Sequence, residues 1–112
     1  MGVKSMLDNL EAAVVASDIQ FNIVYINKRG EKAFKELLNQ ENILGRNMAE
    51  CHQPETMIKL KKMYQDFSDR KMVISHYTMD TPDGKLTVLQ VPYFEGDELA
   101  GVVEFIFPGS LA

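Results

Sequence analysis

The sequence predicts an α+β fold, and three observations lead to this prediction. Two short strand patterns near the start of the chain are followed by a helix pattern. A longer amphipathic helix pattern lies in the middle of the chain. Three strand patterns joined by glycine-containing turns complete it, and consecutive hairpin-linked strands form an antiparallel meander. We therefore expect an antiparallel sheet with helices inserted between its second and third strands.

The amino-terminal residues predict a short helix and a two-stranded hairpin. Met6, Leu7 and Leu10 are spaced to form the apolar stripe of a short amphipathic helix. Such a stripe is expected to cover another surface. Residues 13–17 and 22–26 are apolar runs rich in Val and Ile, and the pair is typical of two strands.

The period of the pattern changes from strand to helix after the hairpin. Asn27 ends the hairpin, and residues 28–38 carry apolar side chains at helical spacing. Asn39 and Gly45 then mark a loop before the next element. The sequence therefore predicts a helix over 28–38 followed by a loop.

The clearest helix pattern runs from Pro54 to Phe67. Pro54 suits a first helical turn, where its missing N–H loses no partner, and Glu55 complements the positive end of the helix dipole. Lysines occupy the opposite, solvated face. The apolar residues recur at three- and four-residue intervals: Met57, Ile58, Leu60, Met63, Tyr64 and Phe67.

Three strands are predicted in the carboxyl-terminal part, over Met72–Met79, Lys85–Tyr93 and Leu99–Phe107. The turns between them contain Gly84 and Gly96, which adopt positive backbone φ angles without steric cost. These strands are therefore expected to form two successive hairpins.

Composition and charge limit the classes of protein. A chain of 112 residues with 46% hydrophobic and 25% charged residues is typical of one compact domain. The single cysteine, Cys51, cannot form an internal disulfide, and residues 1–4 show no signal-segment pattern, so we expect a cytoplasmic protein. A net charge of −4 argues against nucleic-acid binding by this domain, and no apolar run is long enough to span a membrane.

Several short segments follow one another in a recognisable order: Val14-Val15-Ala16-Ser17-Asp18, Ile23-Val24-Tyr25-Ile26-Asn27, Ala33-Phe34, Leu44-Gly45-Arg46-Asn47, Pro82-Asp83-Gly84-Lys85 and Leu99-Ala100-Gly101-Val102-Val103. These segments, together with the order of the elements, resemble the PAS domain family. The similarity covers about residues 10–107, nearly the whole chain. The chain departs from the family pattern at Phe107-Pro108, where the usual Asp-Ile-Thr signature is absent.

This resemblance implies a five-stranded antiparallel sheet with helices on one face, enclosing a pocket that holds haem, flavin, a small metabolite or nothing. We accordingly expect a single domain over residues 1–112, with a flanking helix over 1–11, a core over 12–107 and a tail over 108–112. The implied function is a sensory or regulatory module of a signal-transduction or transcription-regulating protein. It would bind a small-molecule ligand or cofactor, form a homodimer and act on an attached or separate output domain.

Haem b held by His52 is the sharpest version of this expectation. Imidazole is a good axial ligand to iron, and the segment around His52 resembles haem-binding PAS sensors. The simpler interpretation is a histidine beside a helix amino terminus that bonds backbone or solvent. Flavin photochemistry would need a cysteine next to Gly45-Arg46-Asn47, and Cys51 lies four residues beyond Asn47. His76 is interpreted as a half-exposed sheet residue.

Methionines near the expected pocket are candidate ligands or pocket walls. Met72 and Met79 are candidates for the opposite axial position, but their odd separation places them on opposite faces of one strand. Met79 shares its face with Tyr77, and the sequence leaves open which face meets the cavity. Met57 on the central helix completes the set of cofactor-binding candidates, although core filling is the simpler role for each methionine.

Two other classes of function remain alongside the sensor. The first is a protein-interaction or dimerisation module with a filled core and no cofactor. The second is a ligand-binding enzyme domain, which the sequence disfavours because it contains no nucleophile elbow, no phosphate-binding glycine loop and no metal motif. We expect no enzymatic activity and no catalytic residues.

Overall fold

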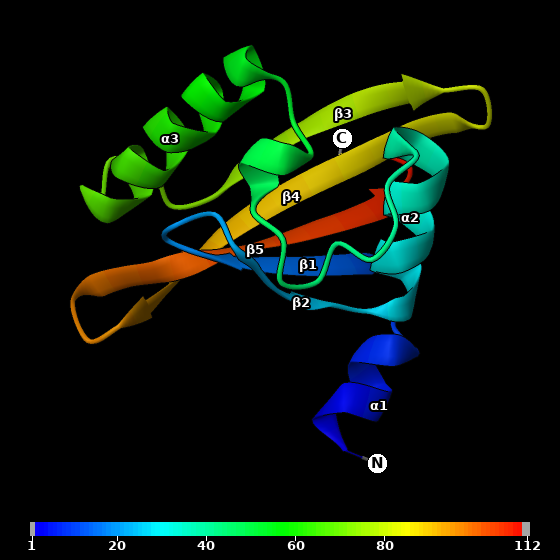
Figure 1. Ribbon diagram of the computed structural model, residues 1–112, viewed down its shortest axis with the longest axis horizontal. Helices are drawn as coiled ribbons and strands as arrows, with labels where there is room; N and C mark the ends of the chain where they lie inside the picture. The colour runs from blue at the N-terminus through cyan, green and yellow to red at the C-terminus, as the bar shows by residue number, and fades with distance from the viewer. Residues whose placement is uncertain (1, 111–112) are drawn as a thin grey trace.

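A computed structural model describes residues 2–110 of the chain. Within them a single five-stranded antiparallel sheet is joined by helices at the places that the sequence predicts (Figure 1). No helix among these residues is long and apolar enough to cross a membrane. The elements are α1 (Val3–Asp8), β1 (Ala13–Asp18), β2 (Ile23–Ile26), α2 (Lys28–Leu38), the 3₁₀ helix η1 (Met48–Glu50), α3 (Pro54–Ser68), β3 (Ser75–Thr81), β4 (Gly84–Glu95) and β5 (Glu98–Pro108).

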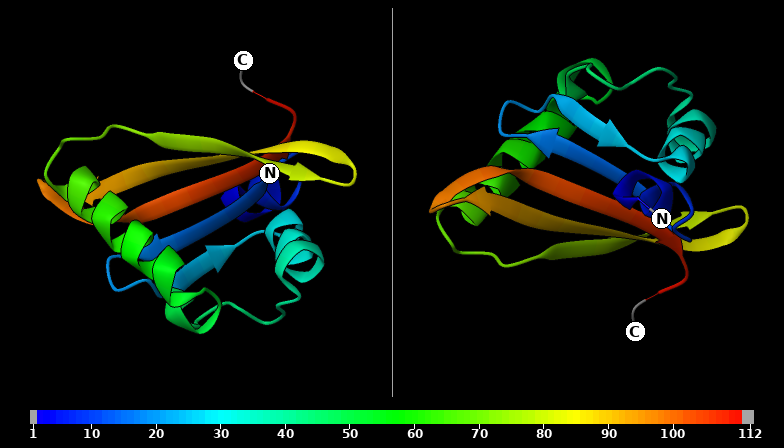
Figure 2. Two further views of the ribbon diagram at one scale, coloured as in Figure 1. Left: turned by 90° about the horizontal axis from the view of Figure 1, so that it is seen from above. Right: turned by 90° about the horizontal axis from the view of Figure 1, so that it is seen from below.

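The strands follow the order β2-β1-β5-β4-β3 across the sheet, and every neighbouring pair is antiparallel. The last strand, β5, therefore lies in the middle, between the first strand and the fourth. Figure 2 shows that α2 and α3 cover the same face of the sheet, and α1 lies apart from them near the β1 and β2 side. This confirms the predicted α+β fold, with the central strand flanked by β1 and β4.

Strand register decides which side chains meet the helices. Glu104 of β5 lies opposite Val15 of β1 and Gln90 of β4, and Gln90 lies opposite Ser75 of β3. Because side chains alternate along a strand, these residues share one face, which we call the inner face. The buried core between this face and the helices is Val15, Ile23, Ile26, Phe34, Ile43, Met48, Met57, Leu60, Tyr64, Phe67 and Val102.

Helix α3 is built as its spacing predicts, with one exception. Pro54 occupies the first turn, and the helix buries Met57, Leu60, Tyr64 and Phe67 at intervals of three and four residues. Ile58, which the sequence pattern assigns to the same stripe, is 69% exposed. Its position next to Met57 turns it away from the sheet, because neighbouring residues on a helix lie about 100° apart.

Two predicted elements have wrong boundaries. The strand predicted over Met72–Met79 begins at Ser75, so Met72 lies in the segment before β3. Helix α1 ends at Asp8, which leaves Leu10 outside the predicted apolar stripe. The loop predicted from Asn39 to Gly45 contains no helix or strand, and η1 follows it, beginning with a capping box between Asn47 and Glu50.

The predicted tail over 108–112 is partly held by the sheet. The N–H of Gly109 donates to the carbonyl of Lys85, and Thr87 Oγ1 donates to the carbonyl of Gly109 at 2.6 Å. Residues 111 and 112 lie outside the described part of the chain. The ordered region therefore extends at least two residues beyond the predicted core.

Asn27 joins the amino-terminal segment to the sheet and to α2. Its Oδ1 accepts hydrogen bonds from the N–H groups of Val14 and Gly30, each at 2.8 Å. Its Nδ2 donates to the carbonyls of Leu7 at 2.7 Å and Ala12 at 3.0 Å. The residue is completely buried, so these groups have no water to replace a lost partner.

We predict that Asn27→Ala lowers the free energy of unfolding by about 2–4 kcal/mol, because it leaves buried backbone groups without partners. Chemical denaturation measures this change, and hydrogen exchange of residues 3–8 should show that α1 is released. Asn9→Ala is the control, since Asn9 is exposed and its side chain bonds only the Ser5 carbonyl among described residues. Equal destabilisation by the two substitutions would contradict the role of Asn27.

Candidate functional site

The candidate site is a small cavity between the inner face and the helices. Its volume is about 20 Å³, which is enough for about one water molecule or a group of that size. The wall is mostly apolar, with four polar residues from three strands and one helix. The lining residues are Val15, Ser17, Ile23, Phe34, Met48, Leu60, Met63, Tyr64, Gln90, Val102 and Glu104.

Tyr64 connects α3 to the far side of the cavity. Its hydroxyl forms a short hydrogen bond with Ser17 Oγ on β1 and lies 3.8 Å from Met48 Sδ. Its ring lies 4.5 Å from the ring of Phe21, measured between centroids, in a tilted pair. Burial raises the pKa of the Tyr64 hydroxyl to about 12, so the group stays protonated at neutral pH.

Glu104 places a carboxyl group in the cavity wall. Gln90 Nε2 donates to its Oε2 at 3.3 Å, across the pair of β4 and β5. Glu104 as a whole is half-buried, whereas its carboxyl group is surrounded by protein atoms. This burial raises the pKa of Glu104, while the Gln90 bond and the charge of His52 oppose the shift. Among the described residues, none of the salt bridges involves Glu104.

His52 lies between η1 and α3 and is half-buried. Its Nδ1 lies 2.9 Å from the carbonyl oxygen of Met48, so the ring donates through Nδ1 and leaves Nε2 for another partner. The side chain lines an open groove of about 520 Å³ at the carboxyl end of α2. His52 is not among the residues that line the cavity, although its charge would lower the pKa of Glu104.

The other predicted cofactor-binding residues are spread over the sheet and α3. Met57 belongs to α3 and is one of the residues that this helix buries in the core. Met79 and Tyr77 share the inner-face register with Ser75 on β3, which settles the face that the sequence leaves open. Tyr77 remains 48% exposed, although burial of its hydroxyl and the charge of Glu104 raise its pKa to about 12.

Met72 lies elsewhere. It packs against the edge of the core and lines an apolar groove with Val73, Ile74 and residues of β4. Tyr77 and His52 therefore both lie within electrostatic range of one carboxyl group, Glu104, whereas Met72 lines a separate groove.

The volume of the cavity can be compared with the volume that haem needs. Sites for bound ligands of this size have volumes of roughly 300–1,000 Å³, compared with about 20 Å³ for this cavity. His52 Nε2 is chemically suited to iron, but haem does not fit the space that the side chains leave. Haem binding would require α3 or its methionines to move away from the sheet.

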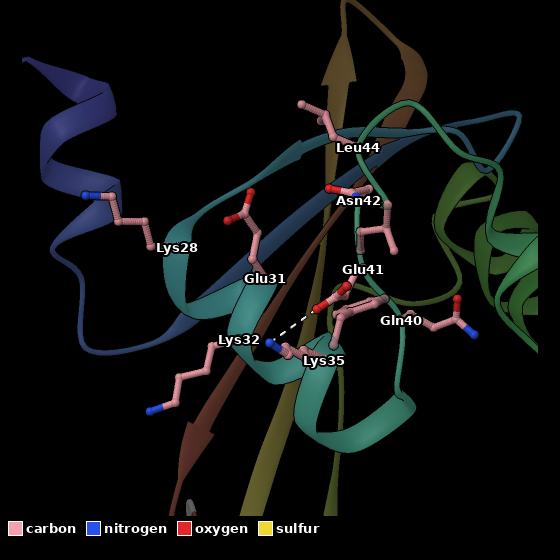
Figure 3. A pocket seen from close by; sticks show the side chains of 10 residues that line it. Lys28, Glu31, Lys32, Lys35, Gln40, Glu41, Asn42 and Leu44 are labelled. Carbon is pink, nitrogen blue, oxygen red and sulfur yellow. Dashed lines mark ion pairs between the residues drawn. The ribbon is translucent and has the colours of Figure 1, made fainter.

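A larger hollow lies outside the inner face and holds none of the predicted site residues. It is an open groove of about 720 Å³ between α2 and residues 40–44 (Figure 3). Lys35 and Glu41 form an ion pair of 3.2 Å across it, drawn as a dashed line in Figure 3. Its other charged side chains are exposed lysines and a glutamate, which is typical of a solvated surface.

Sequence analysis missed the four polar residues of the cavity: Ser17, Tyr64, Gln90 and Glu104. The sequence does contain an indication of Glu104 as a site residue, since it is a charged residue at the centre of an apolar strand pattern. Gln90 shows the same interruption in β4. No group of three or more metal-ligating side chains occurs in residues 2–110.

The family model described as PAS domain matches residues 3–107. The chain therefore belongs to the PAS domain family, as the order of its elements suggested. Comparison with curated proteins gives no match.

Solved structures share the fold at low sequence identity. The carboxyl-terminal domain of a Streptococcus mutans protein has a TM-score of 0.77 and 18% identity, covering 93% of this chain and 80% of that one. A sensory box sensor histidine kinase from Vibrio cholerae has a TM-score of 0.64 and 16% identity, covering 97% and 90%. The VqmA protein of Vibrio cholera, in a complex with ligand and DNA, has a TM-score of 0.62 and 18% identity, covering 91% and 47%.

The raised pKa of Glu104 makes stability depend on pH. A carboxyl group whose pKa is higher in the folded state stabilises the fold below its ordinary value of 4.5, and this stabilisation is lost as pH rises through the folded-state value. We predict that Glu104→Gln raises the Tm relative to the original protein, by at least about 4 °C more at pH 8 than at pH 4.5.

Thermal unfolding at the two pH values measures this difference. Glu98→Gln is the matched control, because Glu98 is an exposed residue at the start of the same strand. A Tm difference for Glu104→Gln that does not change with pH would show that the carboxyl group titrates as it does in the unfolded chain.

Proposed function

We propose that this PAS domain is a sensory module of a cytoplasmic signalling or transcription-regulating protein, and that it binds a small molecule in the inner cavity. The observation that carries the proposal is the buried carboxyl group of Glu104 in the wall of that cavity. A charged group is costly to bury without a partner, so its position is better explained by ligand binding than by core stability. The domain itself is proposed to be non-catalytic.

Helix α3 is the element that would respond to a ligand. It contributes Leu60, Met63 and Tyr64 to the cavity, opposite the strand residues. A ligand larger than the cavity must move these side chains, and differential binding to two positions of α3 would supply the energy of the response. Met48 and Met63 suit this role because methionine is flexible and adapts to irregular shapes.

Similar proteins support the sensory part of the proposal. The Vibrio cholerae structure is named as a sensor histidine kinase, and the VqmA structure contains a ligand together with DNA. The chain covers only 47% of the VqmA chain, so the output of this protein is not inferred from it.

We predict that the purified protein, or the protein incubated with a cell metabolite extract, carries a small molecule in its native mass spectrum. The fraction of protein that carries this added mass should be smaller in the Tyr64→Phe and Ser17→Ala variants, because each substitution removes the hydrogen bond between Tyr64 and Ser17 at the cavity wall. Protein at its bare mass under both conditions would contradict ligand binding.

The absorption spectrum of the same sample tests the haem prediction. A Soret band after reconstitution that disappears in His52→Ala would establish haem ligation by His52. A colourless protein with an added mass would establish a ligand of another kind.

A second function is favoured by the exposed apolar residues of α1. None of the six residues of α1 is buried, and Val3 and Met6 are 70% and 49% exposed. An exposed apolar stripe on a terminal helix commonly binds another surface. The domain would then act as a dimerisation module through α1, with or without a ligand.

We predict that the chain is a dimer in light scattering and that a protein lacking residues 1–11 is a monomer, because the apolar surface of α1 is removed. Val3→Ser with Met6→Ser should have the same effect without shortening the chain. Ile58→Ser is the control, since it removes an equally exposed apolar residue from α3. A dimer that persists after truncation would place the interface elsewhere.

A further inference from the structure

The central carboxyl group of the cavity lacks a cationic partner from the protein. In the described part of the chain, no lysine or arginine is among the residues that line the cavity. The surface carboxylates of Asp8, Asp66 and Asp80, in contrast, form ion pairs of 2.9–3.1 Å with lysines. Among the described residues, the one basic side chain that lowers the pKa of Glu104 is His52, and it lines the separate groove at the carboxyl end of α2.

The polar groups around Glu104 are mainly hydrogen-bond acceptors. Gln90 donates one Nε2 hydrogen to Glu104, which leaves its second Nε2 hydrogen and its carbonyl oxygen, and the oxygen can accept from a ligand. The hydroxyls of Ser17 and Tyr64 bond each other, and Tyr64 donates to Met48 Sδ. A ligand that brings several N–H donors therefore matches this set better than a ligand that brings acceptors.

The apolar wall also suits a positive charge. Phe34 and Tyr64 present aromatic rings to the cavity, and Met48 and Met63 present polarizable thioethers. Aromatic faces attract cations, and the attraction increases where water is excluded. A carboxylate beside aromatic rings is a combination that favours an ammonium group.

We propose that the cavity binds the ammonium group of a small organic amine, with Glu104 as its counter-ion and Gln90, Ser17 and Tyr64 around it. This inference rests on the proposed ligand-binding function and names the ligand class. The amine carries no anionic group beside its nitrogen, because no lysine or arginine lines the cavity to receive one. The volume of about 20 Å³ accepts the head group alone.

The organic part of the amine would extend out of the cavity along the inner face of the sheet. Tyr77 shares that face with Ser75 and Gln90 and is 48% exposed, so the helices leave the β3 side of the sheet uncovered. An alkyl tail would pass from Glu104 toward Tyr77, displacing the methionine side chains of the cavity.

Two-dimensional NMR titrations at pH 8 test this proposal with methylammonium chloride as the probe. Potassium chloride at the same ionic strength, methanol as a neutral analogue and glycine as an amine with a carboxylate are the comparisons. We expect saturable shifts of the Gln90 side-chain amide and of the Ser17 backbone with methylammonium alone. Glu104→Gln should weaken the binding about tenfold or more, and Glu98→Gln should leave it unchanged.

Each outcome decides one question. Methylammonium shifts that equal those of potassium chloride, or that persist in Glu104→Gln, would overturn the amine proposal. Saturable binding of methanol or glycine in its place would overturn the amine class while supporting a ligand site. No saturable shift with any probe, together with a bare mass in the native spectrum, would overturn the ligand-binding function as well.

Discussion

The position of every amino-terminal element depends on one buried side chain, that of Asn27. A primary amide is the side-chain group that combines two donor hydrogens with a carbonyl acceptor, and Asn27 uses both ends at once. Its oxygen receives the N–H groups of β1 and α2, and its nitrogen reaches the carbonyls of α1 and of the segment before β1. At this position an aspartate would lack the N–H donors, and a leucine would lack both the donors and the acceptor.

The first turn of α2 also approaches β2 closely at Gly30, where a Cβ atom would lie 2.6 Å from the side chain of Ile26.

Asn47 has a corresponding role on the other side of the core. Its amide donates to the carbonyl of Gln20 and to Asn22 Oδ1, and its carbonyl oxygen caps η1. The two asparagines therefore fix α1, α2 and η1 to the first hairpin through directional bonds. Helix α3 is held differently, through buried apolar residues and the hydrogen bond between Tyr64 and Ser17. Apolar contacts tolerate sliding better than directed bonds do, so α3 is the element of the fold best able to respond to the cavity contents.

Much of the fold follows from the sequence because its signals are local. The period of the apolar residues predicts α2, α3 and the three late strands, and Gly84 and Gly96 have the positive φ angles that the turns require. The composition of the cavity depends on contacts between residues that are far apart in the sequence, and a local sequence pattern does not predict such contacts. Glu104 lies beside Gln90 only because β5 inserts between β1 and β4, and Ser17 reaches Tyr64 across 47 residues of sequence. Histidine is rare in this chain, which makes His52 a candidate site residue from the sequence alone, whereas the spacing of Tyr64 predicts only an apolar residue of a helix.

The small volume of the cavity has a consequence for signalling. A large preformed pocket binds its ligand with little change in the protein, and such binding shifts no conformational equilibrium unless the two states differ in affinity. This cavity accepts one small group, so any tail on that group must displace Met48, Met63 or α3 itself. The energy of the contact with Glu104 is then available only in the displaced state. Under the proposed function, the limited space would couple ligand binding to movement of α3, and the strength of the ion pair with Glu104 would limit how far the position of α3 can shift.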